Sequence, residues 1–173
     1  MAEKSILKAA DMTDAYIKRD RMRYVKNKLS GNLAIISIVF NVLFFVSIYK
    51  SNVGQYYYKP LIGGSIVYNL LFMMIVFLVS EGSKNYQITY SYIAIPVSLL
   101  QFARIFIYPV TAHNSMTLTT GIEEQVMKDP QFIRLVIYLS VSGASLLLSA
   151  VIGIIKCRNL KTHIAEVEAA KVS

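Results

Sequence analysis

Four long apolar stretches, separated by short polar segments, dominate the pattern of hydrophobic and polar positions along this chain. They cover residues 33–49, 61–80, 89–108 and 133–155. Each is close to the ~20 residues that an α-helix needs to cross a hydrocarbon layer about 30 Å thick. The pattern therefore predicts an all-α polytopic membrane protein, with four transmembrane helices in an antiparallel bundle.

A soluble helical bundle is the alternative interpretation of the same pattern. The helices of a soluble bundle carry a polar stripe rich in charge, whereas the first two apolar stretches contain no charged residue. Composition agrees with the membrane interpretation, because 55% of the 173 residues are hydrophobic and the mean hydropathy is +0.49. Soluble domains of this size are less apolar.

Basic residues are concentrated on one side of the predicted membrane. Eight lie before the first stretch, one lies between the second and third, and four follow the fourth. The other side of the predicted membrane has only four basic residues. The positive-inside rule then places both termini in the cytoplasm, and we expect a multi-pass protein of the plasma membrane. The predicted organisation is a basic cytoplasmic segment (1–31), a transmembrane domain (32–155) and a cytoplasmic tail (156–173).

The segment before the first stretch is expected to form a basic amphipathic helix. Its apolar positions form an imperfect stripe: Met12, Ala15, Tyr16, Met22, Val25 and Leu29. Such a helix suits the inner surface of the membrane, where lysine and arginine contact anionic lipid headgroups. A helix docked on a partner protein and a solvated tail are the alternatives. No nucleic-acid-binding motif accompanies the net charge of +8, so nucleic acid is not an expected partner.

An eight-residue sub-sequence occurs in both of the first two stretches. SIVFNVLF begins at Ser37, and SIVYNLLF begins at Ser65. Each copy places an asparagine, Asn41 or Asn69, four residues after its serine and on the same helix face. The two helices run in opposite directions, so the asparagines can meet and hydrogen-bond within the membrane, which favours a role in helix packing. A substrate or ion site on the pair and a chance similarity are the alternatives.

The third and fourth stretches each carry a row of small or polar residues. Ser98, Gln101 and Arg104 follow one another at intervals of three on the third. Arginine within a membrane usually faces other helices, and we expect one of three arrangements for it: pairing with an acidic residue of the outer loop, snorkelling to headgroups, or contact with another subunit or a ligand. The acidic candidates are Glu123, Glu124 and Asp129.

The row on the fourth stretch consists of Ser145, Ser149 and Gly153, at intervals of four. Small residues at this spacing let two helices approach closely. With the polar row of the third stretch, it is the candidate face for a partner or a pore. Within the outer loop that precedes this stretch, residues 121–128 are expected to form a short helix.

Chemistry-bearing motifs are missing from the sequence. The apolar stretches hold no aspartate or glutamate, which proton-coupled carriers generally need, and the chain has no phosphate-binding loop, metalloprotease motif or nucleophile elbow. His113 and His163 lie on opposite sides of the predicted membrane. We therefore expect no enzyme activity, no metal and no cofactor.

The sequence favours a non-catalytic structural or accessory subunit of a larger membrane complex, such as a transporter. Four helices with short loops leave little interior for a solute path, so the chain is expected to pack against other membrane subunits. The alternative is a homo-oligomeric channel or small carrier whose polar pore is lined by the first three stretches. In that case the partner is a second copy of the chain.

Overall fold

The computed structural model describes residues 27–49, 60–114, 116–119, 122–125 and 127–172. Its helices are α2 (Lys28–Tyr49), α4 (Pro60–Lys84), α5 (Ile88–Ile105), the π-helix η2 (Phe106–Val110), α6 (Thr111–His113) and α7 (Asp129–Val172), and its strands are β1 (Met116–Thr119) and β2 (Ile122–Gln125). The amphipathic helix that the sequence predicts before residue 27 lies outside the described residues and stays a prediction.

Within the described residues, four helical segments are long and apolar enough to cross a membrane, as predicted. They cover Lys28–Ile48, Gly63–Lys84, Ile88–His113 and Asp129–Glu166. The third combines α5, η2 and α6, which follow one another without a break. These four helices indicate a multi-pass membrane protein.

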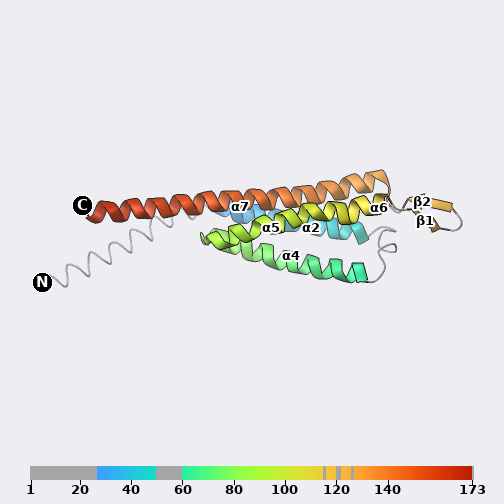
Figure 1. Ribbon diagram of the computed structural model, residues 1–173, viewed down its shortest axis with the longest axis horizontal. Coiled ribbons are helices and arrows are strands. Elements are labelled where there is room, and N and C mark those ends of the chain that lie inside the picture. The colour runs from blue at the N-terminus through green and yellow to red at the C-terminus, as the bar shows by residue number, and fades with distance from the viewer. Residues whose placement is uncertain (1–26, 50–59, 115, 120–121, 126, 173) are drawn as a thin grey trace.

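The segment between α6 and α7 differs from the prediction, because it forms a β-hairpin where a short helix was expected. Strands β1 and β2 pair antiparallel, with Thr117 opposite Glu124 and Thr119 opposite Ile122. The expected helix over residues 121–128 is therefore wrong. Threonine and isoleucine are branched at Cβ, which restricts their side chains in a helix and suits them to strands. Figure 1 shows the hairpin beyond the end of the helices.

Helix α7 continues far beyond the stretch that the sequence assigned to the membrane. Its 44 residues span about 66 Å, more than twice the thickness of a hydrocarbon layer. The tail predicted after residue 155 is helical as far as Val172. Figure 1 shows this C-terminal part of α7 projecting past α2, α4 and α5.

The buried face of α2, together with Asn27 just before it, carries mainly small and polar residues, with Phe44 and Ile48 buried near its end, while most of its other large apolar residues face outward. Buried positions recur at intervals of three and four: Asn27, Ser30, Ala34, Ser37, Asn41, Phe44 and Ile48. Val39, Leu43 and Val46 on the other faces are 41–51% exposed. This is the arrangement expected in lipid, where small residues allow close helix contact and polar groups must find partners.

Hydrogen bonds from serine and asparagine join the helices at the end of the bundle where α2 begins. Ser30 and Ser149 are reciprocal partners, since each hydroxyl donates to the other residue's carbonyl, at 2.8 and 2.7 Å. Ser80 Oγ donates to Gly31 O at 3.0 Å, and Asn27 Nδ2 donates to Ser83 O at 2.6 Å. The first residues of α2 therefore contact the last residues of α4 and the second half of the membrane segment of α7.

Two apolar clusters fill the bundle, one toward each end. The first contains Phe44, Ile48, Ala112, Met127, Leu135 and Leu139, and the second contains Ala34, Phe72, Val76, Val79, Ala94, Leu146 and Ala150. On α2 and α7 a polar layer lies between the two clusters, because Asn41 falls between Ala34 and Phe44, and Ser142 falls between Leu139 and Leu146. This layer holds Asn41, Asn69, Gln101 and Arg104, four of the polar side chains that the sequence singled out.

Gly82 packs closely against Tyr90 where α4 and α5 meet at their connecting turn. A Cβ atom at Gly82 would meet the ring of Tyr90 and lie 2.8 Å from Tyr90 Cβ, whereas a Cβ at Gly64 would meet nothing within 4 Å. We predict that Gly82→Ala lowers the free energy of unfolding by about 1–3 kcal/mol, because neither group can move aside easily. Gly64→Ala, the matched control, should be neutral or stabilising by up to about 1 kcal/mol. Unfolding in detergent measures both, and equal effects would contradict the packing described.

Candidate functional site

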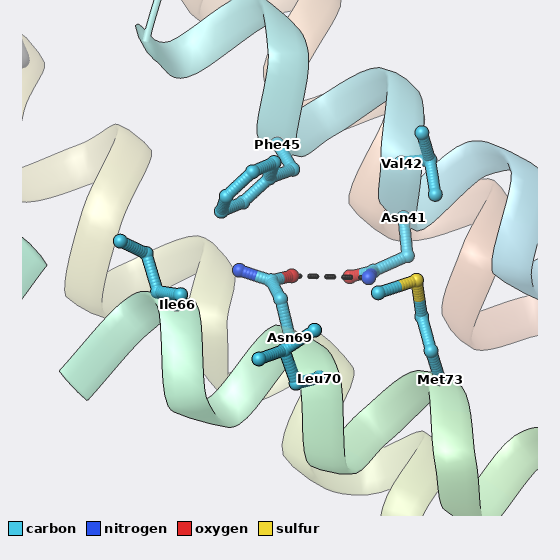
Figure 2. Close-up of a pocket in the computed structure, with 7 residues that line it drawn as sticks. All are labelled: Asn41, Val42, Phe45, Ile66, Asn69, Leu70 and Met73. Carbon is cyan, nitrogen blue, oxygen red and sulfur yellow. Dashed lines mark hydrogen bonds between the residues drawn. The ribbon is translucent and has the colours of Figure 1, made fainter. Parts of the chain in front are cut away.

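Asn41 and Asn69 form the starting point of the polar layer. Asn41 Nδ2 donates to Asn69 Oδ1 at 3.0 Å, across the contact between α2 and α4 (Figure 2). Asn69 Nδ2 in turn donates to the carbonyl oxygen of Ser65, one turn earlier on α4, at 2.7 Å. The repeated sub-sequence thus places the two amides together, at the position where the sequence expected them to meet.

Gln101 of α5 links this pair to α7. Its Nε2 donates to Asn41 Oδ1 at 2.9 Å and to Ser142 Oγ at 3.0 Å. Ser142 Oγ donates to the carbonyl oxygen of Ser37 at 2.9 Å, and the Ser37 and Ser142 hydroxyl oxygens are 3.1 Å apart. Side chains of α2, α4, α5 and α7 therefore share one connected set of hydrogen bonds.

Arg104 lies at the centre of this set and is 3% exposed. Its Nη1 donates to Asn41 Oδ1 at 2.8 Å and to Gln101 Oε1 at 3.0 Å, and its Nη2 donates to Asn69 Oδ1 at 3.3 Å. We call Asn41, Asn69, Gln101 and Arg104 the amide–arginine cluster. Hydrogen bonds from a charged donor are roughly twice as strong as those between neutral groups. The guanidinium therefore makes the strongest hydrogen bonds in the cluster.

Aromatic rings surround the same guanidinium. Its Cζ lies 4.4 Å from the ring centroid of Tyr68, 4.8 Å from that of Phe44 and 5.7 Å from that of Tyr108. The negative face of a ring attracts a cation at these distances, and the attraction grows when the cation is removed from water. Amide oxygens and ring faces together replace part of the solvation that the charge loses on burial.

The acceptor capacity of the two asparagine oxygens is used up. Asn41 Oδ1 accepts from Gln101 and Arg104, and Asn69 Oδ1 accepts from Asn41 and Arg104. An amide oxygen has two lone pairs, so each oxygen reaches its usual limit. The oxygens of this pair therefore serve the protein's own side chains.

The hydrogen bonds given above for Arg104 go to amide oxygens and not to the acidic residues proposed as its partners. The carboxylate of Asp129 is instead 3.7 Å from His113 Nε2, and the His113 ring stacks on Phe132 at 4.5 Å. The side chains of Glu123 and Glu124 lie outside the described part of the chain. The Arg104 side chain also does not snorkel to the membrane boundary, because its two Nη atoms donate to the buried amide oxygens of Asn41 and Asn69.

The remaining predicted residues lie inside the bundle as well. Ser98 Oγ donates to Gly143 O at 3.0 Å, and Ser145 Oγ donates to Ser142 O at 3.0 Å. Ser149 bonds to Ser30, and Gly153 packs close to the Ser91 hydroxyl. Because all of these positions are buried against helices of the same chain, they do not offer an outward face to a partner. That face has to be sought elsewhere on the surface.

The sequence prediction combines the asparagine pair with Gln101 and Arg104 only in the channel alternative, as the lining of a pore, and its site residues do not include Ser142 or Tyr68. The structure joins them, with Tyr68 OH 3.5 Å from Gln101 Oε1. One signal was available, because an arginine within a membrane needs several acceptors and the two asparagines were nearby candidates. Which helices meet, and at what depth, could not be read from one sequence.

A small cavity lies beside the asparagine pair, between α2 and α4. Its volume is about 60 Å³, and it is lined by Asn41, Val42, Phe45, Ile66, Asn69, Leu70 and Met73 (Figure 2). This volume corresponds to about two water molecules, and five of the seven lining side chains are apolar. Over the described ranges, no group of three histidine, cysteine or acidic side chains is arranged to hold a metal ion.

Comparisons with protein-family models, with curated proteins and with solved structures find no match to this chain. The function of the protein is therefore inferred from the geometry of the bundle and of the amide–arginine cluster.

Asn41 is predicted to be the most sensitive neutral residue of the cluster. Asn41→Leu removes an acceptor that Gln101 and Arg104 share. Because an N–H of the buried guanidinium then loses its partner, the free energy of unfolding should fall by at least about 2 kcal/mol. Ser37→Ala is the matched control one turn away, because the Ser37 carbonyl still accepts from Ser142. Its cost should be near the ~0.6 kcal/mol typical of single side-chain hydrogen bonds in membranes. If an unfolding titration gave equal losses of unfolding free energy for the two variants, Asn41 would contribute no more than a residue with a single side-chain hydrogen bond.

Proposed function

We propose that this protein is a non-catalytic integral membrane protein that acts as a structural or accessory subunit of a larger membrane complex. The observation that carries the proposal is the hydrogen-bonding of the amide–arginine cluster, whose residues lie on α2, α4 and α5 and which reaches α7 through Ser142. These polar side chains hold the helices of one chain together. A subunit that serves as a scaffold needs such a fixed interior, whereas a carrier needs polar groups that can exchange partners with a solute.

A pore or carrier pathway through the single chain has less support. Pore-lining amides would face water, whereas Asn41, Asn69 and Gln101 are at most 2% exposed and bond to one another or to Arg104. The cavity beside them, at about 60 Å³, is too small for a hydrated ion. The alternative of a homo-oligomeric channel would need a pore between copies, away from this cluster.

A catalytic role also lacks support from the cluster's chemistry. General acid–base catalysis needs a group that titrates near the working pH, and amides do not titrate while arginine stays protonated. His113, the histidine nearest to the cluster in sequence, bonds to Met127 O and lies 3.7 Å from Asp129 near the outer loop. The proposal therefore includes no cofactor and no metal.

In the membrane, we place the four long helices as an antiparallel bundle across the plasma membrane with both termini in the cytoplasm. The distribution of basic residues supports this orientation. The cytoplasmic side then carries the extension of α7 beyond residue 155, and the outer side carries the β-hairpin. Both project from the bundle and are available to other subunits, and the exposed apolar faces of the helices contact lipid or neighbouring transmembrane helices.

The mass of the complex purified in mild detergent tests the accessory role. We expect a stable assembly that contains this chain together with unrelated membrane subunits. A matched preparation of Arg104→Ala should lose yield and thermal stability, because the guanidinium holds the bundle together. A ring made only of this chain, with ion flux in liposomes that disappears in Arg104→Ala while the ring stays intact, would overturn the proposal.

The orientation has its own test by single-cysteine labelling in a Cys157→Ser background. Met116 is 63% exposed in the hairpin, and Thr162 is exposed on the α7 extension. A membrane-impermeant maleimide added to intact cells should label Met116→Cys, and it should label Thr162→Cys only after the membrane is opened. The reverse pattern would invert the topology, and labelling of both variants in intact cells would exclude a membrane between them.

A further inference from the structure

The outward face of α7 changes from apolar to basic at one point along the helix. Leu148, Val151 and Ile155 are 44–54% exposed and follow one another at intervals of three and four. Arg158 continues this row three residues later, and Lys161 follows after another three; both are exposed. Exposed leucine, valine and isoleucine mark the part of α7 in contact with hydrocarbon, so the apolar layer ends near Ile155.

Distances along the helix place the two basic residues at the depth of lipid headgroups. With a rise of 1.5 Å per residue, Arg158 lies about 4.5 Å beyond Ile155 and Lys161 about 9 Å beyond it. The headgroup layer on each side of a bilayer is about 5–8 Å thick. Side chains on a helix also lean toward its N-terminus, which here points back into the membrane. Both cationic groups can therefore reach the phosphate layer.

The charge around this point is positive. Lys28, at the start of α2, is exposed at the same end of the bundle, while Lys84 is bound to Glu81 at 2.7 Å and contributes little net charge. Lys156, on the neighbouring face of α7, adds a further positive charge. Glu166 lies about 16 Å beyond Ile155, outside the headgroup layer. A negatively charged ligand at Arg158 and Lys161 is therefore attracted on balance.

We propose that Arg158 and Lys161 form a binding site for the headgroup of an anionic phospholipid in the leaflet at this end of the bundle. The guanidinium of Arg158 donates two parallel hydrogen bonds to phosphate oxygens, and the ammonium of Lys161 neutralises a second negative group. The site rests on the proposed passage of α7 through the membrane. It ties the extension to the inner surface and so sets the angle at which residues 156–172 meet other subunits.

Thermal unfolding of the purified full-length chain in neutral detergent tests the site. Dioctanoyl phosphatidylglycerol is titrated in, with dioctanoyl phosphatidylcholine and inorganic phosphate as separate arms. We expect the anionic lipid to raise the melting temperature and the other two to leave it unchanged. Arg158→Gln with Lys161→Gln should need roughly thirtyfold more anionic lipid for the same rise, since each basic residue near a membrane surface contributes about a fivefold factor.

The matched control removes two positive charges at the other end of α7, one of them on the residue just before the helix. Lys128→Gln with Arg134→Gln changes the net charge equally at exposed positions and should respond to the anionic lipid as the wild type does. Equal losses in both double variants would reduce the effect to net charge and overturn the site. A rise with inorganic phosphate would identify an adventitious ion only, and a rise with phosphatidylcholine would show that the headgroup charge is irrelevant.

Native mass spectrometry supplies a second readout that does not depend on the melting temperature. The wild type and the control should retain bound phosphatidylglycerol after delipidation, and the Arg158/Lys161 variant should lose it. Retention by all three proteins would overturn the site. This outcome is distinguishable from a failure of the accessory role, because the assembly state is read from the mass of the protein complex, and bound lipid is read from the small mass increments on it.

Discussion

The guanidinium of Arg104 is buried among helices that otherwise contact hydrocarbon, and its need for partners determines how those helices pack. A charge removed from water without partners costs many kcal/mol, and lipid offers none of the hydrogen bonds that it loses. Arg104 regains some of them from Asn41, Asn69 and Gln101, and three aromatic rings attract its charge. Because these partners sit on α2, α4 and α5, the charge is satisfied only when those helices are assembled.

The same constraint explains why small and polar residues mark many of the helix contacts, while many large apolar residues lie on the outside of the bundle. In water, large apolar side chains are the ones that drive helices together, but in a bilayer they gain little by leaving lipid. Small residues and hydrogen-bonding groups then mark the contact surfaces, as Ser30, Ser37 and Asn41 do on α2. The apolar clusters on either side of the polar layer exclude water from it, and a lower local dielectric strengthens each hydrogen bond within it.

The sequence predicted the features that depend on composition and local spacing. The length and apolarity of the four stretches predicted four membrane-spanning segments, and the interval between Ser37 and Asn41 predicted a shared face. It did not predict that Arg104 would join the asparagine pair, because that contact depends on the relative depth and rotation of α5 against α2 and α4. The length of α7 was predictable in principle, since no glycine or proline follows Gly153 and lysine, leucine, alanine and glutamate favour helices.

A double-mutant cycle between Arg104→Met and Asn41→Leu measures whether the guanidinium and the Asn41 amide stabilise the bundle through each other. The free energy of unfolding is measured for the wild type, both single variants and the double variant in the same bilayer mimetic. If the guanidinium and the amide stabilise the bundle through each other, the two costs are non-additive, with a coupling energy on the order of 1–3 kcal/mol. Costs that add to within about 0.5 kcal/mol would show that the two residues act independently, and the account given for the polar layer would be wrong.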